Sequence, residues 1–344
     1  MNTITTRSQF RLSKITSRLL FTLVFYGLFG AQTTEAQIIP GLGGERAGTT
    51  AGSFLKIGVG GRASAIGEAF VALANDVSAL YWNPAGITQL KRNNVHFSHI
   101  EYVADVQHEF LGYVRRIGSF NAVGLSIVAL HTDDMNVTTE VQPFGTGETF
   151  GFSDIMIGLT FAREFTDKFS TGVTVKYVRE DLADVSMTGV LIDAGTLYKI
   201  GFRGARFAVS ITNFGPEFET SGTVRDFLGA PREDVDFESF PAPLLLRVGF
   251  VFDLIKFENS RALLAFQLDH PNDESENFNY GAEYWFNDMI ALRAGYKKVA
   301  EIGGISLGFG LDMSIESLNL QLDYSFSEFG VLGNLNRFSF NLSF

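Results

Sequence analysis

Alternation of apolar and polar residues near the end of the chain constrains its fold more than any other feature. Positions 338, 340, 342 and 344 are Phe, Phe, Leu and Phe, whereas the positions between them are Ser, Asn and Ser. A period of two places these sets on opposite faces of a β-strand, whereas a helix would distribute the apolar residues around its surface. The segments 317–327 and 302–313 alternate in the same way. The C-terminal part of the chain therefore predicts consecutive strands.

The same reasoning, applied from Asn94 onward, predicts fourteen strands. They are expected at 94–103, 107–117, 120–132, 151–165, 168–180, 187–200, 204–213, 241–253, 260–270, 276–286, 289–299, 302–313, 317–327 and 334–344. An even number of strands long enough to cross a bilayer indicates an all-β fold, a 14-stranded antiparallel outer-membrane β-barrel over residues 94–344.

Connection lengths support the barrel over a soluble β-sandwich. The two longest connections, 133–150 and 214–240, both follow odd-numbered strands, while every connection after an even-numbered strand is short. A bacterial barrel has short periplasmic turns and longer outer loops. A sandwich has no reason to sort its connections in this way.

Composition agrees with a membrane barrel. Hydrophobic residues make up 46% of the chain and 34 residues are Phe, yet no stretch after residue 40 reaches the roughly 18 continuous apolar residues of a membrane helix. There is no cysteine, which excludes disulfides, thiolate sites and a lipoprotein anchor.

The first 36 residues have the order of a secretory signal peptide. Four basic residues between Arg7 and Arg18 precede the apolar run 19–30, and Thr34 and Ala36 supply small residues before a cleavage site. The alternative is an N-terminal anchor helix, for which the run is short. Cleavage after Ala36 would leave 23 basic and 37 acidic residues, a net charge of −14. Such a charge gives no electrostatic case for binding nucleic acid.

Residues 37–93 do not alternate and are rich in Ala and Gly. Small residues let one backbone approach another closely, as the filling of an irregular pore requires. Asn75 or Asp76 is expected to cap a short helical turn over residues 77–82. We therefore expect a small, partly helical plug, or hatch, inside the barrel.

One stretch of this segment resembles a known family. Residues 51–87 are similar to the N-terminal signature of the PorV/PorQ family, which ends in Tyr-Trp-Asn-Pro-Ala-Gly. Where many relatives have Gly-Ala-Arg, this chain has Gly60-Gly61-Arg62, one small residue in place of another. The matching residues are Gly61, Arg62, Ala63, Gly67, Ala69, Phe70, Val71, Ala72, Asp76, Ala79, Tyr81, Trp82, Asn83, Pro84, Ala85 and Gly86.

The resemblance implies a fold and a function. PorV/PorQ proteins are related to FadL-type transporters of hydrophobic compounds, whose fourteen-stranded barrels carry an N-terminal hatch. Members act in type IX secretion, so that the expected partners are secretion-system proteins or secreted cargo at the outer surface. The alternative is a FadL-like channel with hydrophobic ligands, or detergent, in its lumen. Either protein would reside in the outer membrane, in contact with its lipid.

The plug signature carries the candidate site residues. Arg293, Lys297, Arg337 and Asp323 are expected inside the barrel. They either line a polar lumen or pair with plug residues such as Arg62, Glu68 and Asp76, and the pairing is favoured. Phe70 belongs to the same signature. Tyr81 and Trp82 would wedge the plug against the wall or cap a ligand path. Pro84 should push Asn83 out of helical geometry and Gly86 should let the chain reverse, which makes Asn83, Pro84, Ala85 and Gly86 a hinge. Phe344 resembles the terminal aromatic read by barrel-assembly machinery.

No residue pattern predicts catalysis or a cofactor. His96 and His99 lie three apart on one strand and therefore face opposite ways, which does not suit a shared metal. Gly58, Gly60 and Ala63 match a dinucleotide-binding pattern without the β-α-β context that it requires. An outer-loop Ca²⁺ site is weighed against solvated loop tips for Glu233, Asp234, Asp236, Glu238, Asp269, Asp273 and Glu274. The sequence favours solvated tips and a protein that is not an enzyme.

Overall fold

The structure is a computed structural model that describes residues 48–344 apart from 139, 226–230, 233–235, 299–303 and 331–332. The predicted signal peptide 1–36, its cleavage site and the first part of the predicted plug lie outside the described residues. Glu233 and Asp234 lie outside them as well.

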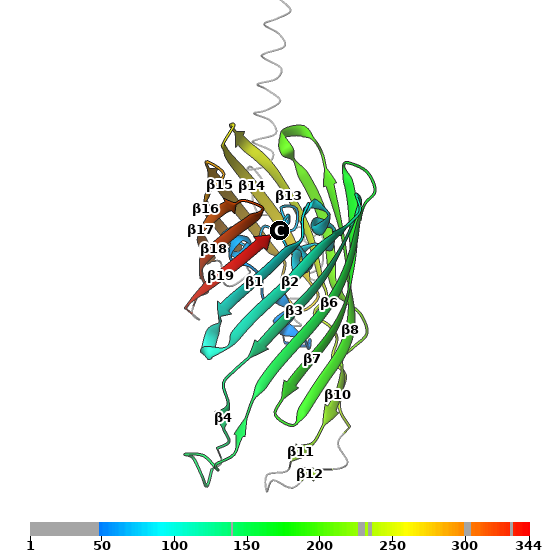
Figure 1. Ribbon diagram of the computed structural model, residues 1–344. Coiled ribbons are helices and arrows are strands. Elements are labelled where there is room, and N and C mark those ends of the chain that lie inside the picture. Colours follow the sequence, from blue (N-terminus) through cyan, green and yellow to red (C-terminus); the bar gives the residue numbers. More distant parts are fainter. Residues whose placement is uncertain (1–47, 139, 226–230, 233–235, 299–303, 331–332) are drawn as a thin grey trace, which may run out of the picture. The chain divides into compact units, whose positions relative to one another are not determined.

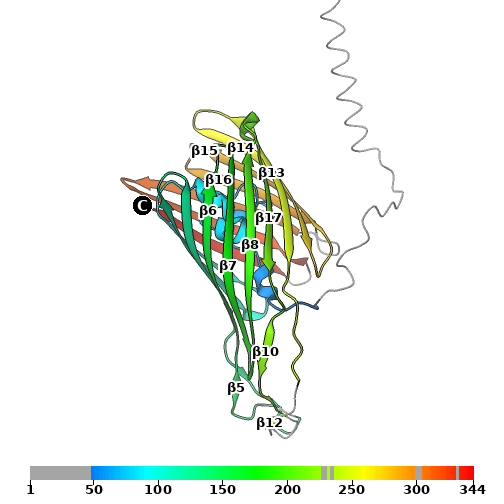
Figure 2. The same ribbon diagram turned by 90° about the vertical axis from the view of Figure 1, so that its right-hand side faces the viewer.

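Fourteen antiparallel strands form a closed barrel (Figures 1 and 2). The strands are β1 (Asn94–Glu101), β2 (Gln107–Ile117), β3 (Asn121–His131), β6 (Phe152–Glu164), β7 (Phe169–Leu182), β8 (Val185–Lys199), β9 (Arg206–Phe214), β13 (Leu245–Lys256), β14 (Ser260–Pro271), β15 (Asn277–Phe286), β16 (Ile290–Lys298), β17 (Gly304–Ile315), β18 (Leu318–Glu328) and β19 (Asn334–Ser343). Each strand pairs with the next, and β19 returns to β1 with Phe97 opposite Phe340. The predicted strand number and order are confirmed, and closure leaves the barrel without a free edge.

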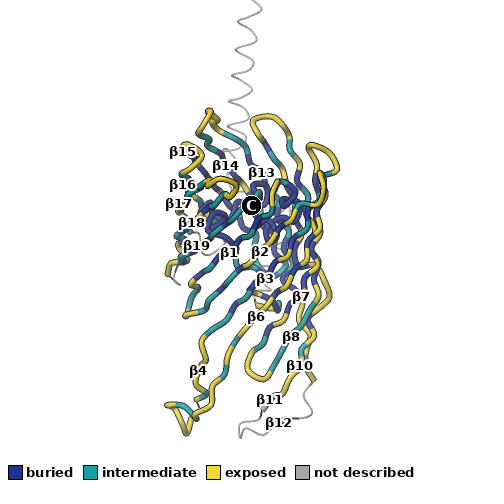
Figure 3. The backbone as a smooth tube through the Cα atoms, in the orientation of Figure 1, coloured by how far each residue is buried: buried dark blue, intermediate teal, exposed yellow. Residues whose placement is uncertain are grey.

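Buried and exposed residues alternate along the strands of the wall (Figure 3), and the two faces differ in chemistry. In β7, Ser170, Thr174 and Lys176 are buried and face the lumen, while Val173 and Val175 are about half exposed on the outside. Most large exposed side chains in the strands are likewise Phe, Leu, Ile, Val or Tyr. The alternation of the sequence is therefore that of a barrel with a polar interior and an apolar outer surface, as a lipid bilayer requires.

The two long connections contain short strands that the sequence pattern did not predict. These are β4 (Met135–Asn136), β5 (Thr149–Phe150), β10 (Glu219–Gly222), β11 (Val224–Arg225) and β12 (Pro231–Arg232). β4 pairs with β5, β11 pairs with β12, and β10 extends the barrel sheet beside β8. All of them lie at the same end of the barrel (Figures 1 and 2), which we call the long-loop mouth; the opposite end is the short-turn mouth.

Residues 48–93, which we call the inner segment, lie in the lumen. Its helices are η1 (Ser53–Lys56), α2 (Gly61–Ala65), α3 (Ala79–Trp82) and η2 (Pro84–Gln89), and two further short helices, η3 (Val103–Asp105) and η4 (Phe202–Gly204), lie in connections between strands. Helix α2 contacts β16 to β19, while η2 contacts β3, β6, β7 and β8 on the other side of the barrel. A segment that touches opposite walls must cross the interior. Among the described residues, no helix has the length and apolar character needed to cross a membrane.

The inner segment runs from one mouth to the other. The Ala51 N–H donates to the Pro241 carbonyl in the connection before β13, at the long-loop mouth (3.1 Å). At its other end, Arg92 donates to the carbonyl of Ser317 in the turn between β17 and β18 (2.8 Å). Strand β1 therefore starts from the short-turn mouth.

Candidate functional site

A buried arginine fastens the inner segment to the wall. The Arg62 Nε and Nη2 atoms donate to both carboxylate oxygens of Glu283 on β15, at 2.8 and 2.9 Å. Its Nη1 donates to Asn75 (2.7 Å) and to Asp76 (3.2 Å) within the inner segment. This two-pronged geometry is the strong form of an ion pair, and it satisfies a guanidinium that is only 5% exposed. Asp76 also accepts from the Ser78 N–H. Helix α3 begins only at Ala79 and its N-cap residue is Ser78, which corrects the prediction that Asn75 or Asp76 caps a turn over residues 77–82.

The same network continues along the wall. Arg293 on β16 donates from Nε to Glu283 and from Nη1 to Asp323 on β18, both at 2.7 Å. The interior placement predicted for Arg293 and Asp323 is confirmed. Glu283 was not predicted as a partner. Its place on the polar face of β15, two residues after Gly281 and four after Asn279, indicates that it faces the interior.

A second charged cluster involves Glu68. Its carboxylate accepts from Lys297 on β16 and lies 4.0 Å from a guanidinium nitrogen of Arg337 on β19. Burial alone would favour the neutral acid, yet these two cations hold the pKa of Glu68 below its usual range. The predicted pairing of Glu68 with Lys297 and Arg337 is confirmed.

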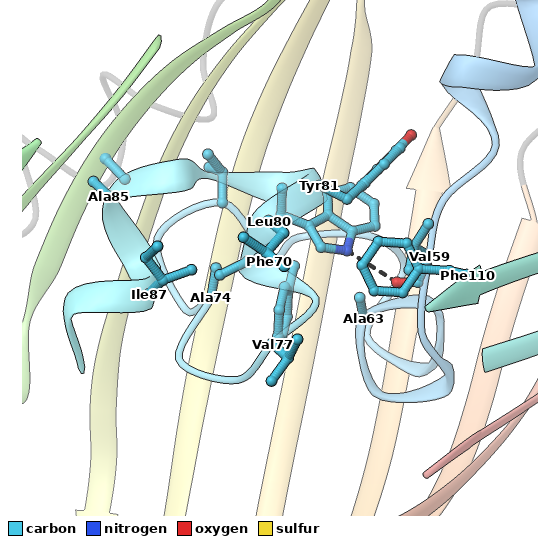
Figure 4. Packing of buried hydrophobic residues seen from close by; sticks show 14 of the residues in the cluster. Val59, Ala63, Phe70, Ala74, Val77, Leu80, Tyr81, Ala85, Ile87 and Phe110 are labelled. Carbon is cyan, nitrogen blue, oxygen red and sulfur yellow. Dashed lines mark hydrogen bonds between the residues drawn. The ribbon is translucent and has the colours of Figure 1, made fainter. Parts of the chain in front are cut away.

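Tyr81 and Trp82 are both buried. Figure 4 shows Tyr81 among the packed apolar side chains of the inner segment. The Trp82 indole N–H donates to the Val59 carbonyl (2.9 Å), and the Tyr81 hydroxyl donates to the Leu55 carbonyl (3.0 Å). The guanidinium of Arg247 on β13 lies 5.1 Å from the centroid of each ring. The pair thus joins distant parts of the inner segment and meets the wall through a cation–π contact.

Phe70 extends this aromatic cluster. Its ring is fully buried, meets Trp82 edge to face at 6.1 Å, and lies under the Arg62 guanidinium. The backbone N–H groups of Phe70 and Val71 both donate to the side-chain oxygen of Gln267 on β14. Strand β14 therefore binds the backbone of the inner segment.

The predicted hinge at residues 83–86 packs against the opposite wall. Asn83 is extended, as the following Pro84 requires, and its side chain accepts from the Ala85 N–H while donating to the carbonyls of Val71 and Thr196. Ala85 is fully buried. A Cβ on Gly195 of β8 would lie 2.1 Å from the Asn83 side-chain oxygen, so only glycine admits this contact.

The reason predicted for Gly86 is wrong. Gly86 lies inside η2 and is absent from the residues with positive φ, so it does not reverse the chain. A Cβ there would lie 2.3 Å from the Ala74 carbonyl oxygen. The residue must be small because two parts of the inner segment touch at this point, a contact that no local sequence rule reveals.

Phe344 ends the chain at the short-turn mouth. Its backbone N–H and carbonyl both bond to Asn93, and its side chain is 46% exposed on the outer surface. An assembly signal at this position remains a prediction.

The acidic residues considered for Ca²⁺ that the structure describes do not form one group. Asp269 belongs to β14 rather than to an outer loop, which corrects its predicted place, and it accepts from Gln267 and Asn279. Asp273 and Glu274 instead bind Lys56. In the part of the chain that the structure describes, no three His, Asp or Glu side chains form a group that could hold a metal.

A cavity of about 450 Å³ opens at the long-loop mouth between the inner segment and β15 to β19. We call it the long-loop pocket. Its apolar lining comes from Ile57, Tyr102, Phe329 and Leu335. Its charged lining comes from Lys56, Glu68, Asp273, Glu274, Lys297, Glu328 and Arg337.

A second cavity of about 300 Å³ opens at the short-turn mouth. Arg62 and Asn75 of the inner segment line it, together with Lys199, Arg206 and Asp253 of the wall. Because Arg62 lines this pocket and Glu68 lines the other, the buried inner segment and its ion pairs separate the two cavities.

Comparison with solved structures shows the same fold. The Ralstonia pickettii toluene transporter TbuX matches with a TM-score of 0.55 and 13% identity, over 83% of this chain and 97% of that one. The Pseudomonas putida toluene transporter TodX matches with a TM-score of 0.53 and 14% identity, over 83% of this chain and 96% of that one. A Pseudomonas aeruginosa FadL homologue matches with a TM-score of 0.52 and 12% identity, over 83% of this chain and 98% of that one. The chain therefore has a FadL-type barrel fold.

Sequence comparison gives a family. No curated protein matches the chain. Residues 30–212, just over half of the chain, match the family described as "Uncharacterised protein family (UPF0164)". The PorV/PorQ resemblance of residues 51–87 remains a prediction beside this match. The chain belongs to the UPF0164 family.

Proposed function

We propose that this protein is an outer-membrane channel for hydrophobic small molecules and that the inner segment is its plug. The long-loop pocket carries the proposal, because it lies where a molecule from outside would first meet the plug. Its volume falls in the range of small-molecule sites, roughly 300–1,000 Å³. Ile57, Phe329 and Leu335 give it an apolar side.

The apolar outer surface of the barrel supports a location in the outer membrane. Half-exposed apolar side chains such as Leu159, Phe161 and Leu307 suit contact with lipid, and cleavage after Ala36 would export the chain. We propose that the long-loop mouth faces the outside of the cell, as the longer loops of bacterial barrels do.

Passage requires the inner segment to move. The long-loop pocket and the second cavity, at the short-turn mouth, lie on opposite sides of the ion pairs of Arg62 and Glu68. A bound molecule shifts the plug only if it binds the open arrangement more tightly than the closed one. The long-loop pocket is thus an entry site, and the plug is the gate.

Fold similarity favours the channel over a secretion accessory, since two of the three structures compared above are toluene transporters. One observation still favours the secretion role as a second candidate. Val141 and Phe144, in the connection between β4 and β5, are 90% and 99% exposed. Apolar side chains at an outer loop tip suit contact with a partner or exported protein.

Uptake of radiolabelled toluene by intact cells tests the channel. The chain is produced in the outer membrane of a bacterium that lacks its own FadL-type channel, and uptake should exceed that of cells with an empty vector. Ser306 lines the long-loop pocket, so Ser306→Phe should return uptake to the empty-vector rate. Ile305→Phe adds a ring to the outer face of the same strand and should leave uptake unchanged.

The gel mobility of unheated protein shows whether each variant is folded. Folded wild-type protein without added uptake would contradict the channel. Loss of secreted proteins on deletion of the gene, with uptake unchanged, would favour the second candidate instead.

A further inference from the structure

The charges of the long-loop pocket form two poles of opposite sign. At the acidic pole, Asp273 and Glu274 share one cation, Lys56. At the cationic pole, Lys297 and Arg337 share one carboxylate, Glu68. Among these six groups, each pole therefore has one charge in excess. Glu328, the remaining charged lining residue, is exposed at the end of β18 and forms no ion pair with either pole among the described residues.

The acidic pole has acceptor capacity left over. Lys56 lies 2.8 Å from one oxygen of Asp273 and 2.6 Å from Glu274, and Thr50 donates to the same Asp273 oxygen. Asp273 is only 1% exposed, and its second oxygen, Oδ1, has no hydrogen-bond partner among the described residues. The side-chain oxygen of Asn277, which also lines the pocket, is unpartnered in the same sense.

The cationic pole has donor capacity left over. Arg337 is 5% exposed, yet its contacts are long: 3.3 Å to the Ser327 hydroxyl and 4.0 Å to Glu68. Its Nε has no partner among the described residues. A buried guanidinium with such weak acceptors keeps most of its desolvation cost.

A ligand that completes both poles must carry an anion and a cation together. A carboxylate can accept from Arg337 Nε, and an ammonium group can donate to Asp273 Oδ1. A molecule with only one charge satisfies one pole and leaves the other unpaired, and a neutral hydrocarbon satisfies neither. Ile57, Tyr102, Phe329 and Leu335 offer contacts for an apolar body.

We propose that the long-loop pocket binds zwitterions with an apolar body, such as an α-amino acid with an aromatic side chain. The carboxylate is held by Arg337 and Lys297, and the ammonium group by Asp273 and Glu274. This assignment goes beyond the proposed function. It takes from that function only that the pocket is open to molecules from outside, and it names a further class of molecule that the pocket binds.

Four probes with one aromatic body test the assignment. Phenylalanine, 3-phenylpropionate, 2-phenylethylamine and ethylbenzene differ in whether they carry both charges, one charge or none. Their binding to the full-length protein in lipid nanodiscs is measured by calorimetry at pH 7. Phenylalanine should bind at least tenfold more tightly than each of the other three.

Two variants test which charged group of the ligand each pole binds. Glu274 and Lys297 are partly exposed, so replacing them should leave the fold intact. Glu274→Gln should weaken phenylalanine binding and leave 3-phenylpropionate binding unweakened, whereas Lys297→Gln should weaken phenylalanine and spare 2-phenylethylamine. The matched controls Glu276→Gln and Lys298→Gln alter neighbouring residues that do not line the pocket, and they should change nothing.

Ethylbenzene binding as tight as that of phenylalanine would overturn the assignment, and so would equal effects of both variants on all charged probes. The proposed function would survive either result if toluene uptake persists. Absence of toluene uptake together with tight, charge-dependent phenylalanine binding would contradict the hydrophobic channel and leave the zwitterion site standing.

Discussion

At the scale of single residues, Asn83 shows how one polar side chain holds three parts of the molecule. It is fully buried, caps η2 through the Ala85 N–H, and donates to carbonyls of the inner segment and of β8. A buried polar group that loses its only hydrogen-bond partner costs about 1–3 kcal/mol. The Asn83-Pro84 step therefore attaches the inner segment to β8, in addition to forming a turn.

Asn83→Asp should destabilise the protein more than Asn83→Ala does. The aspartate places an unpaired negative charge against two carbonyl oxygens, at a cost of about 3–5 kcal/mol, whereas alanine loses a cap worth about 1 kcal/mol and the two hydrogen bonds to these carbonyls. The measurement is the temperature at which the folded band disappears from a gel of unboiled samples. Asn287→Asp, in an exposed turn, is the control. Equal transition temperatures for both Asn83 variants would contradict this account.

At the scale of elements, the inner segment is held to the wall by charged pairs at several points. Arg62 binds β15, Glu68 binds β16, and Lys56 binds the connection after β14. Burial alone would lower the pKa of Lys56, but the hydrogen bonds to Asp273 and Glu274 raise it above its usual range. These attachments make the position of the plug dependent on charge.

Acid should weaken the attachment at Glu68. Because its pKa in the folded protein is lowered from 4.5, the carboxylate contributes stability above pH 4.5, and this contribution is lost as the pH falls through the folded pKa. The difference in melting temperature between the wild type and Glu68→Gln should therefore be largest near pH 7 and shrink below pH 4.5. Circular dichroism between pH 7 and pH 3 measures it, with Glu258→Gln as an exposed control. A difference in melting temperature that grows as the pH falls would contradict the stabilising role assigned to the Glu68 carboxylate.

Sequence reasoning predicted the wall better than the interior. Strands such as β7 and β19 follow from alternation because each residue has only two faces to choose between. Residues 219–222 do not alternate clearly, and β10 forms only because β8 extends beyond the barrel rim to pair with it. The partners of Arg62 and the fit of Gly86 against Ala74 depend on how the inner segment folds in three dimensions, which no period reveals.

At the scale of the whole molecule, a closed barrel with an apolar outside surrounds a segment that contacts strands on opposite walls. The cavities at its two mouths are separated by buried side chains and ion pairs of that segment. In the proposed function, this arrangement is a route with an entry at each end and a gate between them. It accounts for the polar faces of the strands and for the small residues of the inner segment together.

Electrical conductance in planar lipid bilayers tests the gate most directly. The full-length protein is compared with a variant that lacks residues 53–86 and whose barrel is verified by its gel mobility before and after boiling. The account predicts little steady ion current for the full-length protein and large, discrete current steps for the variant. Equal currents through both proteins would contradict the claim that the inner segment closes the barrel.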